Sequence, residues 1–168
     1  IKSFKQIAVD QSIEEKRVFN VNNYINEVLL SLNPKLKMTK LTVGIDCPKD
    51  LEIYSYPGGL SQILTNLVVN SIVHAYDEGE KGTISIKIST ENDTMKFIYS
   101  DDGKGISKDD LIKIFDPFFT TKRGTGGTGL GLNIVYNIVT QQYGGTIKCE
   151  SVFGDGTTFI INIPLHEP

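Results

Sequence analysis

The sequence predicts an α+β fold, a two-layer sandwich in which helices cover one mixed, mostly antiparallel sheet. Two observations indicate this class. Helical and strand periodicities are mixed along the chain, and most neighbouring strands have the short connections typical of antiparallel pairs. The 168 residues, of which 39% are apolar, suffice for one hydrophobic core, so we expect one main domain.

The first part of the chain is expected to alternate helices and strands. Residues 1–19 are predicted to be the end of a helix and a linker, since apolar residues recur at helical spacing before the segment becomes polar. Asn22 is predicted to cap a helix that stops at Pro34. Short strands are expected at 41–46 and 51–56, joined by a turn.

The later elements are predicted in the same way. A proline and two glycines open a long helix at 57–76, and alternating strands follow at 83–89 and 94–100. Another helix is expected to start at Thr128, where apolar residues recur every four positions. The chain closes with an alternating hairpin at 145–165, turned by Gly-Asp-Gly.

Composition excludes several classes of protein. The net charge of −3 and the pI near 5.4 leave no basic excess for nucleic acid or an anionic membrane surface. Cys47 and Cys149 are far apart and in no metal-binding pattern, which favours a reducing, cytoplasmic compartment. No apolar run approaches the roughly 20 residues that span a bilayer. Because the chain begins without Met, we expect it to be part of a longer protein.

Three polar residues on the helix at 57–76 are candidates for a binding site. Asn66, Asn70 and His74 are spaced by four, so they form a line along the edge of the apolar stripe. An amide oxygen is a suitable ligand for Mg²⁺. The alternative is that the two asparagines are solvated surface amides.

Two glycine clusters flank an aromatic run and suggest opposite walls of a nucleotide site. In the first cluster, DDGKGI, the carboxylate of Asp101 ends a strand and can accept from an exocyclic amine such as that of adenine, although an ordinary turn is the alternative. The run FDPFFTTKR supplies Lys122 to reach a terminal phosphate, or else only core rings and surface cations. The second cluster, GTGGTGLGL, leads into a helix and can hold phosphates, but it is neither a P-loop nor GxGxxG.

Taken in order, NLVVNSIVHA, DDGKGI, FDPFF and GTGGTGLGL resemble the N, G1, F and G2 boxes of the ATP-binding catalytic domain of sensor histidine kinases, in the GHKL superfamily. The resemblance covers residues 20 to 165, and DPFFTTK is similar to one subgroup. It implies the Bergerat fold, a mixed sheet backed by three helices, with ATP between the helices and a flexible lid. It also implies that 20–168 is the ATP-binding domain and that 1–19 ends an upstream dimerisation domain.

The resemblance implies roles for individual residues. Asn70 resembles the Mg²⁺ ligand, Asn66 its partner near the phosphates, and His74 the residue beside adenine and ribose. Asp101 resembles the adenine-reading acid, helped through water by Thr158. The adenine wall is expected to include Gly103, Gly105 and Ile106. The lid and phosphate cradle are expected to include Thr121, Lys122, Gly127, Thr128, Gly129, Leu130, Gly131 and Leu132.

Two positions set this chain apart from other members. Val73 stands where many relatives carry Lys or Arg, so a phosphate contact made there elsewhere is in doubt. Asn66 stands where hydrolytic branches of the superfamily have a glutamate base, and an amide cannot serve as that base. The resemblance therefore implies slow hydrolysis and transfer of the γ-phosphoryl group, with Asn66 and Lys122 as catalytic residues.

The expected acceptor is a histidine on the upstream dimerisation domain, so little activity is expected of this chain alone. Further expected partners are ATP, Mg²⁺ and a response regulator, with no nucleic acid. The parent protein is expected to be a homodimer, either cytoplasmic or anchored in the inner membrane, whereas the fragment can be monomeric. The alternatives are a serine kinase or an ATP-dependent switch like the anti-sigma relatives, which the upstream sequence would distinguish, and a binding module without catalysis.

Overall fold

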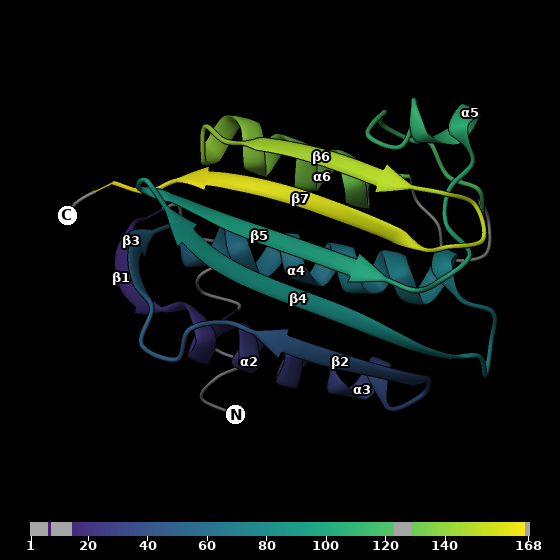
Figure 1. Ribbon diagram of the computed structural model, residues 1–168, viewed down its shortest axis with the longest axis horizontal. Helices are drawn as coiled ribbons and strands as arrows, with labels where there is room; N and C mark the ends of the chain where they lie inside the picture. The colour runs from purple at the N-terminus through teal and green to yellow at the C-terminus, as the bar shows by residue number, and fades with distance from the viewer. Residues whose placement is uncertain (1–6, 8–14, 123–128, 167–168) are drawn as a thin grey trace.

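The computed structural model describes residue 7 and residues 15–122 and 129–166. Within these ranges, five strands form one twisted sheet with helices behind it (Figure 1). The strand order is β2-β4-β5-β7-β6, in which β2 pairs parallel to β4 and all other pairs are antiparallel. The strands are β2 (Lys40–Asp46), β4 (Lys81–Glu91), β5 (Thr94–Asp101), β6 (Thr146–Ser151) and β7 (Thr157–Pro164). The predicted α+β class and mixed, mostly antiparallel sheet are confirmed.

Two further strands form a small separate sheet. β1 (Arg17–Asn20) pairs antiparallel with β3 (Glu52–Ser55). The strands expected at 41–46 and 51–56 therefore belong to different sheets. Residues 17–20 form a strand where a linker was predicted, while 1–6 and 8–14 lie outside the described residues, so the proposed domain boundary stays a prediction.

Three helices carry the layer behind the sheet (Figure 1). They are α2 (Val21–Ser31), α4 (Pro57–Asn70) and α6 (Gly131–Asn137). The last two continue into π-helical turns, η1 (Ser71–Ala75) and η2 (Ile138–Gln142), and single turns form α3 (Asn33–Leu36) and α5 (Lys108–Leu111). The predicted start at Thr128 lies outside the described residues, and the described helix begins at Gly131.

The cap of α2 corrects the sequence interpretation. Asn20, not Asn22, is the N-cap, because its side chain accepts from the backbone N–H of Asn23 at 2.9 Å. Asn22 instead donates through Nδ2 to the carbonyl of Cys47 at 3.2 Å. The helix thus starts directly after β1, with Val21 fully buried.

The core lies between the sheet and α4. Alternate residues of β4, β5 and β7 point to the helices and are almost completely buried, as are the apolar residues of α4. These include Ile84, Ile86, Phe97, Tyr99, Phe159, Ile161, Leu60, Ile63, Leu64 and Leu67. Because α4 is held along its length, the residues at its end have a fixed position relative to the ends of β5 and β7. No helix in the described ranges combines the length and hydropathy needed to cross a bilayer.

A cavity-forming substitution in α4 tests this packing. Leu64 is fully buried, so Leu64→Ala is expected to lower the free energy of unfolding by about 2–5 kcal/mol. The control Leu30→Ala removes the same atoms from an α2 side chain that is 56% exposed, and it should cost less than about 1 kcal/mol. Denaturant unfolding measures both, and equal losses would contradict the assigned core.

Candidate functional site

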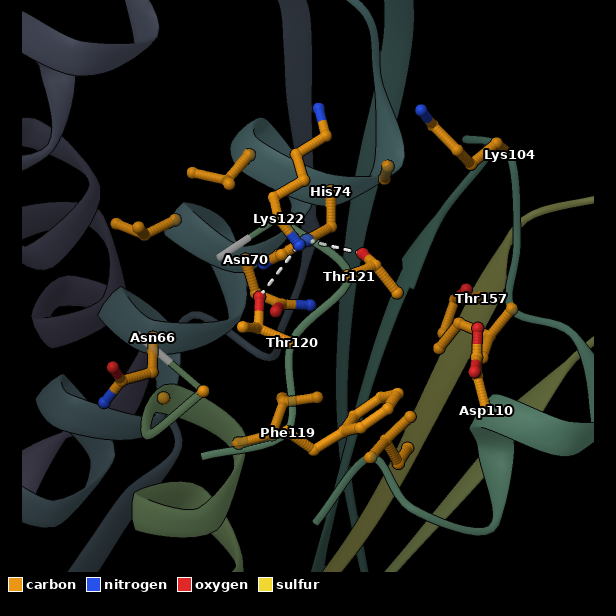
Figure 2. A pocket seen from close by; sticks show the side chains of 18 of the residues that line it. Asn66, Asn70, His74, Lys104, Asp110, Phe119, Thr120, Thr121, Lys122 and Thr157 are labelled. Carbon is orange, nitrogen blue, oxygen red and sulfur yellow. Dashed lines mark hydrogen bonds between the residues drawn. The ribbon is translucent and has the colours of Figure 1, made fainter. Parts of the chain in front are cut away.

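One cavity of about 630 Å³ lies between the end of the α4–η1 helix and the ends of β5 and β7 (Figure 2). Its remaining sides come from residues 104–107, from 119–122 and from the start of α6. The polar residues of the helix face the segment 119–122 across the cavity (Figure 2).

Two asparagines of α4 line the cavity and differ in their contacts. The Nδ2 of Asn66 donates to the carbonyl of Gln62 at 2.9 Å, which leaves Oδ1 directed elsewhere. A Cβ atom on Gly131 would lie 3.4 Å from that Oδ1, so the start of α6 lies beside Asn66. In the described part of the chain, the side chain of Asn70 makes no hydrogen bond, so its amide oxygen is available to a ligand.

At Ser71 the helix widens into the π-helical turn η1, a feature often found at functional sites. Nδ1 of His74 lies 3.2 Å from Oγ1 of Thr121, which links η1 to the opposite segment (Figure 2). Burial lowers the pKa of His74, and the positive charges of Lys122 and Lys104 lower it further. The imidazole is therefore neutral at pH 7 and contributes no charge to the cavity.

The opposite wall centres on Asp101, which is only 8% exposed. Its Oδ2 accepts from Ser71 Oγ at 2.9 Å, and its Oδ1 accepts from the backbone N–H of Gly103 at 3.1 Å. Burial raises the pKa of Asp101, and these donors oppose that rise. The result is an oriented carboxylate at one end of the cavity.

The loop after Asp101 is tied to the end of η1. A Cβ atom on Gly103 would collide with the backbone carbonyl of Ala75, and Lys104 N–H donates to that carbonyl at 2.9 Å. Oδ1 of Asp102 accepts from Tyr76 Oη at 2.6 Å and from another backbone N–H at 2.8 Å. The hydrogen bond from Tyr76 keeps the pKa of Asp102 below its usual value.

Comparison with known proteins assigns the family. The family described as "Histidine kinase-, DNA gyrase B-, and HSP90-like ATPase" matches residues 56–167. Sensor histidine kinase ZraS of Escherichia coli K12 is 38% identical over 146 residues, which cover 87% of this chain and 30% of the relative. The solved catalytic domain of histidine kinase ThkA is 34% identical with a TM-score of 0.74, covering 89% of this chain and 95% of that one. The chain belongs to this family, as the catalytic domain of a sensor histidine kinase.

The kinase domain accounts for only part of such proteins, because it spans about 30% of the length of ZraS. A second structure of ThkA, in complex with response regulator protein TrrA, matches with 29% identity and a TM-score of 0.72, covering 89% of this chain and 41% of that one. The ATP-binding family is therefore established for the domain, whereas the activity and partners of the whole protein remain to be proposed.

Most residues that the sequence singled out in the kinase domain do line the cavity. From the helix and the first glycine cluster these are Asn66, Asn70, His74, Asp101, Gly105 and Ile106. From the segments 119–122 and 129–132 they are Thr121, Lys122, Gly129, Leu130, Gly131 and Leu132. Gly127 and Thr128 lie outside the described residues. The structure thus brings together residues up to 66 positions apart in sequence.

Thr158 is a wrong prediction, because the cavity is lined by Thr157 instead. In the sheet, Asp101 pairs with Thr157, and Thr158 is opposite Ser100 on the other face. Thr158 Oγ1 lies 3.1 Å from Ser100 Oγ. A register error of one residue moves a side chain to the opposite face. Gly103 is not a lining residue either, and its lack of a side chain instead permits the contact with Ala75.

Ser71, which holds the Asp101 carboxylate behind the cavity, was not identified from the sequence. Its position was the signal that could have identified it, because Ser71 is a small polar residue within an apolar stripe and directly follows Asn70. Lys104 and Asp110, which line the cavity, were also missed. Val73 lines the cavity as well and presents an apolar side chain to it.

Glycine substitutions test the junction between the loop and the helix. Gly103→Ala should lower the free energy of unfolding by about 1–3 kcal/mol and weaken nucleotide binding, because the new methyl group meets the Ala75 carbonyl. Gly44→Ala is the matched control, since nothing lies within 4 Å of its added Cβ, and its stability should be unchanged or slightly raised. Denaturant unfolding and nucleotide titration measure the pair. An undisturbed Gly103→Ala protein would refute the close packing.

Proposed function

We propose that this domain binds Mg²⁺-ATP and donates the γ-phosphoryl group to a histidine on an upstream dimerisation domain of the same protein. The observation that carries the proposal is that one cavity is lined both by the buried carboxylate of Asp101 and by the polar side chains of Asn66, Asn70 and Lys122. This arrangement suits a ligand with an amino group at one end and charged phosphates at the other.

Asp101 is the residue we assign to adenine. Its carboxylate already accepts from the Ser71 hydroxyl and from the backbone N–H groups of Gly103 and Thr157, and two carboxylate oxygens together can accept about four hydrogen bonds, which leaves room for a further donor. Ionised Asp101 would accept from the exocyclic amine, with Gly105 and Ile106 beside the base and His74 along the helix wall. Thr157 replaces Thr158 as the threonine that supports Asp101.

Asn70 is the residue we assign to Mg²⁺. Its amide makes no hydrogen bond within the described ranges, and amide and phosphate oxygens are the ligands that Mg²⁺ prefers. The ion, held by Asn70 together with the phosphates, would neutralise negative charge during transfer. Asn66 and the backbone of 129–132 would orient the phosphate chain, and Lys122 would reach its end.

Asn66 favours transfer to a protein side chain over hydrolysis. Its Nδ2 is engaged with Gln62, and neither atom of an amide can take a proton from an attacking water. The histidines of this chain do not fit as acceptors, because His74 forms part of the cavity wall and His166 follows the last strand. The acceptor therefore lies outside this sequence.

The partners and setting follow from the same proposal. We assign a response regulator as the downstream acceptor, supported by the ThkA–TrrA complex, and a homodimeric parent built on the upstream domain. The fragment itself can be monomeric. The acidic charge argues against nucleic acid, and the free cysteines suit the cytoplasm. On the sequence DPFFTTK we assign the domain to the corresponding subgroup of kinases, and we propose a parent that is either cytoplasmic or membrane-anchored.

Metal dependence tests the assignment of Asn70. Asn70→Ala is expected to weaken ATP binding at least about tenfold in Mg²⁺ and to have little effect in EDTA, because only the metal contact is lost. Asn137→Ala, an exposed asparagine of α6, is the control and should bind as the wild type does. Calorimetric titration with ATP measures the affinity of the wild type and of both variants. An equal loss of affinity in Asn70→Ala with and without Mg²⁺ would overturn the assignment.

The acceptor is tested with labelled ATP. The chain alone should form no phosphohistidine at an appreciable rate, and a helical dimerisation domain supplied separately should become labelled on histidine. Phosphohistidine is labile in acid whereas phosphoserine is stable, so acid treatment separates this proposal from a serine kinase of the same superfamily. Rapid self-labelling, or an acid-stable product, would refute the histidine kinase proposal.

A further inference from the structure

Two buried hydroxyl groups lie behind Asp101. Ser71 is 1% exposed and Tyr99 is fully buried. Ser71 Oγ donates to Asp101 Oδ2 at 2.9 Å and lies 2.8 Å from Tyr99 Oη, which is itself 3.1 Å from the carbonyl of Leu67. The two hydroxyls thus lie within hydrogen-bond distance of each other, and Ser71 connects Tyr99 to the carboxylate of Asp101.

The number of hydroxyl hydrogens determines which group donates in each of these hydrogen bonds. Each hydroxyl has one hydrogen to donate. When Asp101 is ionised, Ser71 gives its hydrogen to the carboxylate, so only Tyr99 can supply a hydrogen to the 2.8 Å contact between the two hydroxyls. It then does so in place of its longer, 3.1 Å contact with the Leu67 carbonyl. The Leu67 carbonyl is not left unsatisfied, because it also accepts from the backbone N–H of Ser71. Ionisation of Asp101 thus aligns both hydroxyls toward it.

Neither hydroxyl lines the cavity within the described residues, so both act on a ligand only through Asp101. Buried hydroxyls cost free energy unless they are hydrogen-bonded, and here each has a partner. Ser71 holds one carboxylate oxygen while the backbone N–H of Gly103 holds the other. With both oxygens engaged, rotating the carboxylate plane would break at least one of these hydrogen bonds.

We propose that Ser71 and Tyr99 are positioning residues, a two-hydroxyl relay that orients the carboxylate of Asp101 for the amino group of adenine. The inference rests on the proposed function, because it requires Asp101 to read adenine. Tyr99 acts through Ser71, and Ser71 acts through Asp101.

The test compares ATP with purine riboside triphosphate, which carries hydrogen in place of the amino group. The wild type should prefer ATP, and Ser71→Ala should lose about tenfold of that preference while binding the analogue as before. Tyr99→Phe should lose less in the same direction. The double variant should be no worse than Ser71→Ala, since Tyr99 has no separate route to Asp101.

The pH dependence of ATP binding gives a second test. If Ser71 only stabilised the fold, its substitution would not shift this pH dependence. The Ser71 hydroxyl stabilises ionised Asp101, so Ser71→Ala raises the pKa of Asp101 and moves the acid-side loss of ATP affinity to higher pH. The other ionisable groups facing Asp101 or sharing the cavity are unchanged in the variant. They are Asp102, Tyr76, Tyr99, Cys149, His74, Lys104, Asp110 and Lys122.

Tyr143→Phe is the matched control, since it removes another buried tyrosine hydroxyl, one that donates to the carbonyl of Tyr56 outside the cavity. It should lower stability and leave both the preference and the pH profile unchanged. If the wild type binds the two triphosphates equally, the proposal that Asp101 recognises the amino group of adenine is wrong, and the role proposed for Ser71 and Tyr99 is wrong as well. If the wild type prefers ATP and Ser71→Ala keeps that preference, the relay alone is overturned. Should Ser71→Ala fail to fold, an unchanged preference in Tyr99→Phe overturns it.

Discussion

The site depends on the contact between the end of the α4–η1 helix and the end of β5. Ser71 and Ala75 from the helix meet Asp101 and Gly103 from the sheet through one side-chain hydrogen bond and one backbone contact. The rest of the core fixes the two elements, and this junction sets the position of the carboxylate relative to Asn70, one residue before Ser71 on the helix. A cavity with polar groups on both walls follows from that junction.

Glycine is required where backbones meet around this junction. Cβ atoms on Gly105 and Gly156 would collide with the carbonyls of Val152 and Asp101, and both glycines have positive φ. Lys104 O accepts from Gly154 N–H at 2.6 Å, which joins the first glycine cluster to the β6–β7 turn. The glycines therefore do more than leave room for a ligand, because they let three segments pack at backbone distance.

Local patterns in the sequence predicted the helices and strands and most of the residues that line the cavity. The errors lie where the answer depends on contacts between segments that are far apart in the sequence. The spacing of Asn66, Asn70 and His74 depends only on helix geometry, so these residues were identified correctly as neighbours. The choice between Thr157 and Thr158 depends on the register of β7 against β5, which one sequence does not determine. Ser71 was missed because the partners of its hydroxyl, Asp101 and Tyr99, lie on β5 and come close to it only in the folded structure.

The two ends of the cavity differ in how their charge is held. Asp101 is buried, and its charge depends on donors built into the fold. His74 is neutral and Val73 is apolar, so in the proposed complex the positive charge near the phosphates would come from Lys122 and from the metal ion. In that complex, phosphate binding would therefore depend on the position of the segment 119–122, whereas recognition of the base by Asp101 would not.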